Sequence, residues 1–229
     1  MHVPDGFLDL TTSAATGVVA VGGIAAALRG ARSELDDRTA PLAGLAAVFV
    51  FAGQMINFPV GVGTSGHLLG GALAALLVGP WTATLCVSVV LVVQALLFGD
   101  GGLTALGTNI TLMAIVGVWA AWGAYRLGTA LLPRRVGVLP GVAFVAGLVS
   151  VPVAALAFCA LYAVGGQAPL DFSTLVAVMV GWHTVIGLGE GVITALVVSS
   201  VLAVRPDLVR GARPYRSPAD LEIRSGVRA

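Results

Sequence analysis

The residues best suited to chemistry in this chain are its three histidines. His2 directly follows the first methionine in the opening stretch MHVPDGF, and His67 ends the glycine-rich stretch PVGVGTSGH. His183 belongs to the later stretch WHTVIGLGEG, which also contains Glu190. Neutral imidazole is a common transition-metal ligand, although a lone histidine is more often an ordinary structural residue. The surrounding sequence has to decide between these two interpretations.

The first two residues could bind a metal ion as one unit. Methionine is normally retained before a residue as large as histidine, so we expect Met1 to keep a free amine. That amine and the backbone nitrogen of His2 would close a five-membered chelate ring, and the His2 imidazole would close a six-membered ring. A fourth nitrogen from His67 would complete a square plane, which suits Ni²⁺ or Cu²⁺. Each ligand must lose its proton, so binding should weaken in acid, starting near pH ~6.5 where histidine ordinarily titrates.

The composition is that of an integral membrane protein. Hydrophobic residues make up 58% of the chain and charged residues only 10%, whereas about a quarter of a soluble domain is charged. Apolar runs between charged or Gly/Pro-rich breaks predict an all-α, polytopic transmembrane bundle of about seven spans. The expected spans are residues 11–29, 40–56, 66–79, 82–98, 108–131, 138–164 and 174–204. The third and fourth spans are close enough to form a tight helical hairpin.

The basic residues indicate how the bundle is oriented. All twelve are arginines, and they fall in four places: residues 29–38, 126–135, 205 and 210–228. Seven spans would put all four places on one side, which is the cytoplasmic side by the positive-inside rule. We therefore expect the N-terminus outside and the C-terminus inside. Residues 1–204 should form a single transmembrane metal-capture domain, and residues 205–229 a cytoplasmic Arg-rich tail, either loosely ordered or a short helix.

The outer ends of the spans should form a polar pocket. All five amide side chains fall at or near those ends: Gln54, Asn57, Gln94, Asn109 and Gln167. The candidates to surround the metal ligands are Gln54, Asn57, Ser65, Gln94 and Asn109. Pro4 and the Asp5-Gly6 pair favour turns, so residues 1–10 should fold back as an N-terminal metal-binding plug. The alternative is that each amide only hydrogen bonds to nearby loop backbone.

His183 and Glu190 form a second group within the last span. Their spacing of seven residues puts them on one helical face, and Gly187, Gly189 and Gly191 would let another helix approach closely. Ionisable residues at membrane depth are candidates for function, here as a coupling or hinge element. The alternative is an internal hydrogen-bonded pair that fixes helix packing. A metal role is not expected, because Glu190 should lie too deep to reach an outer-face site.

Taken together, MHVPDGF, the SGH ending at His67 and WHTVIGLGEG resemble the CbiM/NikM family. These proteins are the cobalt/nickel substrate-capture (S) components of energy-coupling factor (ECF) transporters, and the resemblance covers essentially all of residues 1–204. It implies that Met1, His2 and His67 hold the metal and that Ni²⁺ or Co²⁺ is the transported substrate. The implied partners are a transmembrane coupling (T) subunit and ATPase subunits, and a small accessory membrane subunit is left open. The PDGF continuation is more similar to the nickel members.

The predicted function is therefore a non-enzymatic component of an ATP-driven importer, multi-pass in a prokaryotic cell membrane, that binds Ni²⁺ or Co²⁺ at its outer face. The stretch GVGTSG cannot be a P-loop, because the chain has no lysine, so ATP must be hydrolysed by partner subunits. No nucleic-acid signature is evident. One alternative is a stand-alone secondary transporter or channel with His183 and Glu190 as a proton relay, which would predict inverted repeats. A metal-dependent intramembrane enzyme would need a ligand set such as HExxH, which is absent.

Overall fold

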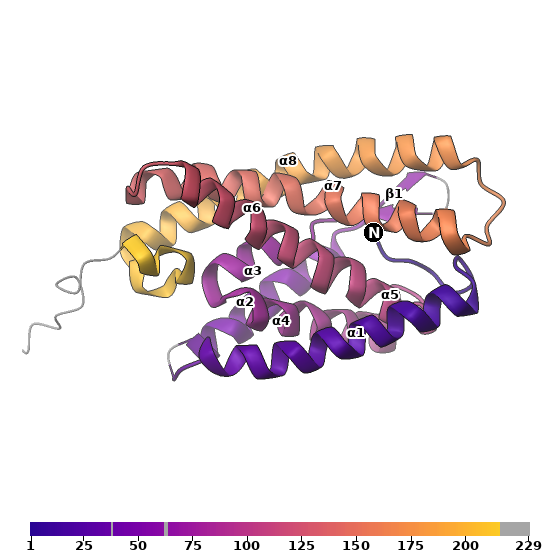
Figure 1. Cartoon of the computed structure of the whole chain (residues 1–229), viewed down its shortest axis with the longest axis horizontal. Helices are drawn as coiled ribbons and strands as arrows, with labels where there is room; N and C mark the ends of the chain where they lie inside the picture. Colours follow the sequence, from indigo (N-terminus) through magenta and orange to yellow (C-terminus); the bar gives the residue numbers. More distant parts are fainter. Residues whose placement is uncertain (38, 62–63, 216–229) are drawn as a thin grey trace, which may run out of the picture.

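The computed structural model describes residues 1–37, 39–61 and 64–215. It is a helical bundle, and five of its helical segments are long and apolar enough to cross a membrane (Figure 1). These are α1 (Leu10–Gly30) with η1 (Ala31–Ser33), α4 (Pro80–Val93) with η2 (Gln94–Phe98), α5 (Leu106–Asn109) with η3 (Ile110–Gly117) and α6 (Val118–Leu131), η4 (Val136–Val138) with α7 (Leu139–Gly165), and α8 (Phe172–Val204). The expected all-α membrane bundle is confirmed.

Two of the seven expected spans are not among these five segments. Helix α2 (Thr39–Met55) has 17 residues, and α3 (Gly71–Val78) has 8, which at 1.5 Å per residue is about 12 Å long. The third expected span, residues 66–79, is wrong as a helix. Its first residues instead end a two-stranded antiparallel hairpin of β1 (Phe58–Gly61) and β2 (Thr64–Gly66). Gly70 then takes a left-handed φ of 72°, which ends the extended backbone and starts α3.

The segment from Asn57 to Gly79 nevertheless runs from one end of the bundle to the other. At one end, Asn57 donates a hydrogen bond to Asp100, which follows η2. At the other end, Gly79 lies so close to Glu34 that an added Cβ would be 2.4 Å from the Glu34 carboxyl carbon. Gly79, with a φ of 100°, joins α3 directly to α4, and the two helices pack together as the predicted tight hairpin. The β1–β2 hairpin, the loop that carries His67 and helix α3 thus take the place of the single helix expected over residues 66–79.

Two buried glutamates cap the N-terminal ends of α3 and α4, which form the helical hairpin. The Glu190 carboxylate accepts hydrogen bonds from the backbone N–H groups of Leu69 (2.6 Å) and Gly70 (3.1 Å), directly before α3. The Glu34 carboxylate accepts one from Thr82 N–H (2.7 Å), in the first turn of α4. Lipid offers no hydrogen bonds to exposed helix ends, so these ends must be satisfied within the protein. Each carboxylate also complements the positive end of its helix.

The two longest helices, α7 and α8, lie side by side along one edge of the molecule (Figure 1). Glycine allows this close contact: a Cβ on Gly147 would be 2.8 Å from the Cα of Gly191, and a Cβ on Gly187 would be 2.7 Å from the Leu148 carbonyl oxygen. The expected close approach at Gly187 and Gly191 is confirmed. Gly189 has no such neighbour and does not take part.

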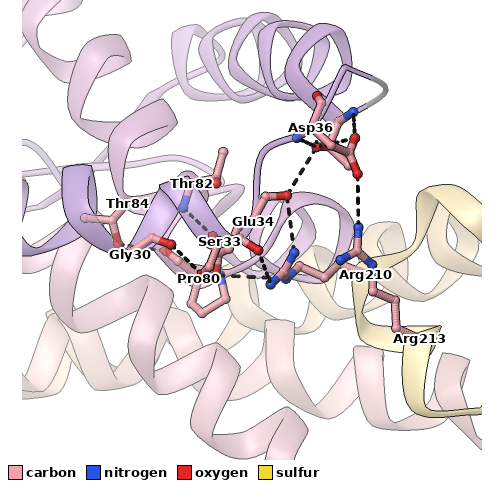
Figure 2. A network of polar contacts seen from close by, with 10 residues as sticks. Gly30, Ser33, Glu34, Asp36, Pro80, Thr82, Thr84, Arg210 and Arg213 are labelled. Carbon is pink, nitrogen blue, oxygen red and sulfur yellow. Dashed lines mark hydrogen bonds and ion pairs between the residues drawn. The ribbon is translucent and has the colours of Figure 1, made fainter.

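The described part of the C-terminal tail is docked rather than loose. Residues 205–215 form two short 3₁₀ helices, η5 (Pro206–Leu208) and η6 (Arg210–Tyr215). Figure 2 shows Arg210 donating hydrogen bonds to the Ser33 and Glu34 carbonyl oxygens, with Arg213 lying 3.6 Å from the Asp36 carboxylate. This contact joins the tail to the α1–α2 connection. The short-helix alternative fits residues 205–215, and residues 216–229 of the expected tail lie outside the described residues.

Candidate metal centre

The N-terminal segment turns back into the bundle, and the chain begins among the helices (Figure 1). Met1 is 1% exposed and His2 is 6% exposed. Backbone contacts fix the segment at its base: Asp9 N–H donates to the Gly165 carbonyl oxygen (2.7 Å), and Gln167 N–H donates to that of Phe7 (3.0 Å). Residues 1–10 are therefore held in place at the α7–α8 connection, as a folded-back segment requires.

Asn109 fixes the backbone next to His2. Its side-chain oxygen accepts a hydrogen bond from Val3 N–H (2.8 Å), and its side-chain nitrogen donates to the Val3 carbonyl (3.1 Å). Gly102 N–H donates to the same carbonyl at 3.0 Å. By contrast, no residue in the described part of the chain accepts a hydrogen bond from the His2 backbone N–H. Buried backbone N–H groups are rarely left without a partner, so this nitrogen is a candidate ligand.

The His2 ring has one nitrogen bound and one free. Its Nε2 donates a hydrogen bond to the Gln94 side-chain oxygen (3.1 Å), which leaves the lone pair on Nδ1. Nδ1 is the ring nitrogen that can chelate together with the residue's own backbone nitrogen. It lies 3.3 Å from an Asp100 carboxylate oxygen. Burial lowers the pKa of His2 to about 4, so at neutral pH two electron-rich atoms face each other, and a cation bound to Nδ1 would relieve their repulsion.

His67 has the opposite ring orientation. Its Nδ1 donates to the Leu68 carbonyl oxygen (2.8 Å), and its Nε2 is buried with no hydrogen-bond partner. The His67 and His2 rings are adjacent, with their centroids 4.5 Å apart. Burial, followed by the nearby terminal amine, lowers the pKa of His67 well below its ordinary value. His67 is therefore neutral and presents a free lone pair beside His2.

The terminal amine completes the set of donors. Burial lowers the pKa of the Met1 amine from 8.0 to about 4, and the Asp100 carboxylate opposes part of this effect. A neutral amine carries a lone pair that can bind a metal. The amine, the His2 amide nitrogen, the His2 Nδ1 and the His67 Nε2 thus come together as four nitrogen donors with no ring proton on the ligating positions. Nitrogen donors of this type suit a transition-metal ion.

The other predicted pocket residues differ in how directly they contact the segments that carry these donors. Gln94 and Asn109 contact the N-terminal segment directly. Gln54 is buried and donates to the Leu69 carbonyl oxygen (2.8 Å), which helps to hold the His67 loop. Asn57 is exposed and contacts Asp100 (3.1 Å). The side chain of Ser65, on β2, makes no hydrogen bond with the described residues, but Ser65 helps to line an open groove of about 420 Å³ that reaches His2.

Asp100 is the functional candidate that the sequence reasoning missed. It lies against His2, lines the groove and carries the negative charge nearest to the terminal amine. The signal was available, because Asp100 is an acid at the predicted outer side, six residues after Gln94. Sequence spacing alone does not show that η2 and the turn at Gly99 place both Gln94 and Asp100 against the His2 side chain.

His183 and Glu190 are both buried on α8 but do not bond to each other within the described structure. His183 Nδ1 donates to the Met179 carbonyl oxygen (2.7 Å), and its Nε2 has no hydrogen-bond partner. Glu190 instead binds the backbone of Leu69 and Gly70, two and three residues after His67. The expected internal hydrogen-bonded pair is therefore wrong for the described residues. Glu190 reaches the loop that carries His67, which its expected depth did not suggest.

Comparison with known proteins adds an independent finding. The family model described as CbiM, cobalt uptake substrate-specific transmembrane region, matches residues 2–208. The fused nickel transport protein NikMN of Rhodobacter capsulatus is 37% identical over 231 residues, covering 96% of this chain and 66% of that protein. The cobalt transport protein CbiM of Sorangium cellulosum is 35% identical over 217 residues, covering 91% and 94%. A crystal structure described as a transition metal transporter is similar with a TM-score of 0.83 and 30% identity, covering 95% of this chain and all (100%) of that one.

Proposed function

Because the chain belongs to the CbiM family of cobalt uptake substrate-specific transmembrane regions, we propose that it is the substrate-capture component of an ECF importer for Ni²⁺ or Co²⁺. Its relatives are named as transport proteins, and the chain is a multi-pass membrane protein rather than an enzyme. The proposed partners are a T subunit and ATPase subunits in a prokaryotic cell membrane. The proposal leaves open whether the assembly also contains a small accessory membrane subunit.

The metal ligands in this proposal are the Met1 amine, the backbone nitrogen and Nδ1 of His2, and Nε2 of His67. The observation that carries the proposal is that these donors gather in one buried place with their lone pairs free. On binding, the metal displaces the proton of the His2 amide and forms a metal–nitrogen bond. The remaining donors are already neutral, so their bonds form without further loss of a proton.

The groove beside His2 is the proposed entry path for the metal. Asp100 provides a negative charge at its wall, which attracts a hydrated cation before the nitrogen ligands replace its water. Gln94 and Asn109 hold His2 and Val3 in position, as residues surrounding a metal site commonly do. Glu190 and Gln54 position the His67 loop from α8 and α2.

The proposed orientation puts this groove outside and the arginine-rich end in the cytoplasm. The α1–α2 connection and residues 205–215 meet at that end, and they carry arginines in both segments. The positive-inside rule assigns such an end to the cytoplasm. Nickel is proposed over cobalt, because four nitrogens in a plane suit Ni²⁺ best and the PDGF continuation is more similar to nickel members.

The decisive experiment lengthens the chain by two residues at its N-terminus. Two glycines placed before Met1 move the amine out of the five-membered ring, so high-affinity Ni²⁺ binding should be lost, and circular dichroism of the metal-free protein checks that the helices remain folded. Isothermal titration with the native and extended proteins in detergent measures both affinities. The same residues added after Ala229 are the matched control. Equal affinity of the native and N-terminally extended proteins would refute the ligand role of the amine.

A further inference from the structure

A second groove lies at the arginine-rich end, away from the metal centre. It has a volume of about 740 Å³ and runs between the end of α6, the following connection and η6. Its cationic side chains are Arg126, Arg134, Arg210 and Arg213, and its aromatic walls are Trp122, Tyr125 and Tyr215. No acidic residue of the described chain lines it. The groove therefore favours an anion.

Two of the four arginines are available to a ligand. Arg210 and Arg213 face the carboxylates of Glu34 and Asp36 (Figure 2). Arg126 and Arg134 are exposed, and neither has an acidic partner among residues 1–37, 39–61 and 64–215. Two guanidinium groups at one groove, without an acidic partner in the described part of the chain, match the oxygens of a phosphate group, which arginine binds through paired hydrogen bonds.

The walls of the groove are fixed by contacts within the protein. The Tyr125 hydroxyl donates a hydrogen bond to the Gly211 carbonyl oxygen (2.8 Å), which attaches η6 to α6. Trp122 stacks on Tyr125 with ring centroids 5.6 Å apart and an interplanar angle of 23°. Val209 and Ala212 are each 1% exposed and belong to the core at this end. The groove is therefore formed before any ligand arrives.

An apolar surface continues from the groove along α6. Leu127 lines the groove and is 60% exposed, and Leu131, one turn further along the same face, is 75% exposed. In a membrane these side chains face lipid tails. The groove thus places unpaired cations beside a surface for acyl chains, which is the arrangement that a phospholipid needs.

We propose that this groove is a binding site for an anionic phospholipid, with its phosphate between Arg126 and Arg134 and its acyl chains starting beside Leu127 and running along α6 toward the membrane interior. A zwitterionic lipid carries its own compensating cation and would gain less from two unpaired arginines. The bound lipid would also contact η6 and so hold residues 205–215 against α6. The metal centre lies elsewhere in the molecule, and the proposal does not depend on it.

The test uses the full chain, delipidated in detergent, and native mass spectrometry to measure lipid binding. Phosphatidylglycerol and phosphatidylcholine with identical acyl chains are compared, and phosphatidylglycerol should bind about 30-fold more tightly, since each arginine near a membrane surface contributes about a fivefold preference for anionic lipid. Equal binding of the two lipids to the native protein overturns the proposal without any mutant. Displacement of the lipid by excess inorganic phosphate would also overturn it, because the ligand would then be free phosphate.

Variants locate the site. Arg126→Gln with Arg134→Gln should reduce phosphatidylglycerol binding about 30-fold, and Lys at both positions should restore most of it. Arg29→Gln with Arg32→Gln removes the same charge from exposed residues outside the groove and should change binding little. An unchanged circular dichroism spectrum and melting temperature confirm that each variant is folded. If the control pair loses as much lipid binding as the groove pair, the attraction is general surface charge and the groove is not the site.

Discussion

Metal binding near neutral pH should release about one proton per Ni²⁺ ion, and this number tests the geometry of the whole site. The perturbation is the binding of Ni²⁺ itself at pH 7. With ordinary pKa values of 8.0 for the amine and 6.5 for each histidine, the ligands would release about 2.4 protons, including that of the His2 amide. Burial lowers the pKa of the amine and of His2 to about 4, and that of His67 well below 6.5. Only the amide proton then remains to be released.

The assay is isothermal titration of Ni²⁺ in buffers of different ionisation enthalpy, which counts the protons released, repeated over a range of pH. The logarithm of the affinity should rise by about one unit per pH unit around neutrality and more steeply only as the pH falls toward 4. The additional, steeper loss of binding that comes from protonation of the amine and the histidines therefore begins below the ordinary histidine pKa of 6.5. His183→Ala is the control, since His183 is not a proposed ligand.

Two outcomes would refute this reasoning in different ways. Release of more than two protons at pH 7 would mean that the amine is charged in the metal-free protein and that the N-terminal segment is not buried as described. Release of none would mean that the His2 amide is not a ligand, and the proposed chelate would be wrong.

Five further predictions concern the surroundings of the site, the bound metal and the stability of the protein. Gln94→Leu removes the acceptor that fixes the His2 ring and should weaken Ni²⁺ binding by about 10–100-fold in titration, whereas His183→Ala should impair transport in cells more than binding. Glu190→Ala leaves two buried N–H groups without an acceptor and should cost about 2–6 kcal/mol of unfolding free energy in denaturant melts, with no loss if the contacts are unimportant. The Ni²⁺ adduct should be diamagnetic with a visible absorption band and resist displacement by equimolar Zn²⁺; a paramagnetic adduct would contradict the planar site. Because the folded amine and His2 hold fewer protons than the unfolded chain between about pH 4 and 8, the stability of the metal-free protein should rise with pH across that window, which thermal melts can measure.

The proposed metal ligands could be chosen from residue types alone, because a chelate formed by a terminal amine and a second-position histidine is local in sequence. His2 and the Met1 amine are adjacent by covalent structure, so no fold is needed to bring them together. The all-α membrane class was readable for a similar reason, since apolar runs of about 20 residues have few other stable environments. The choice of Gln94 and Asn109 followed from their predicted position at one side of the bundle.

Only the tertiary structure decided how the His67 loop is built and which nitrogen of each ring is free. The run from Gly66 to Val78 is apolar enough to read as a span, yet Glu190, more than a hundred residues later, takes the N–H groups of Leu69 and Gly70 and fixes the start of a short helix there. A pattern of neighbouring residues cannot reveal a hydrogen bond to a carboxylate that is distant in sequence. Likewise, the ring nitrogens available to a metal depend on Gln94 and on the Leu68 carbonyl, and the neutral state of the donors depends on burial, which exists only once the helices have packed.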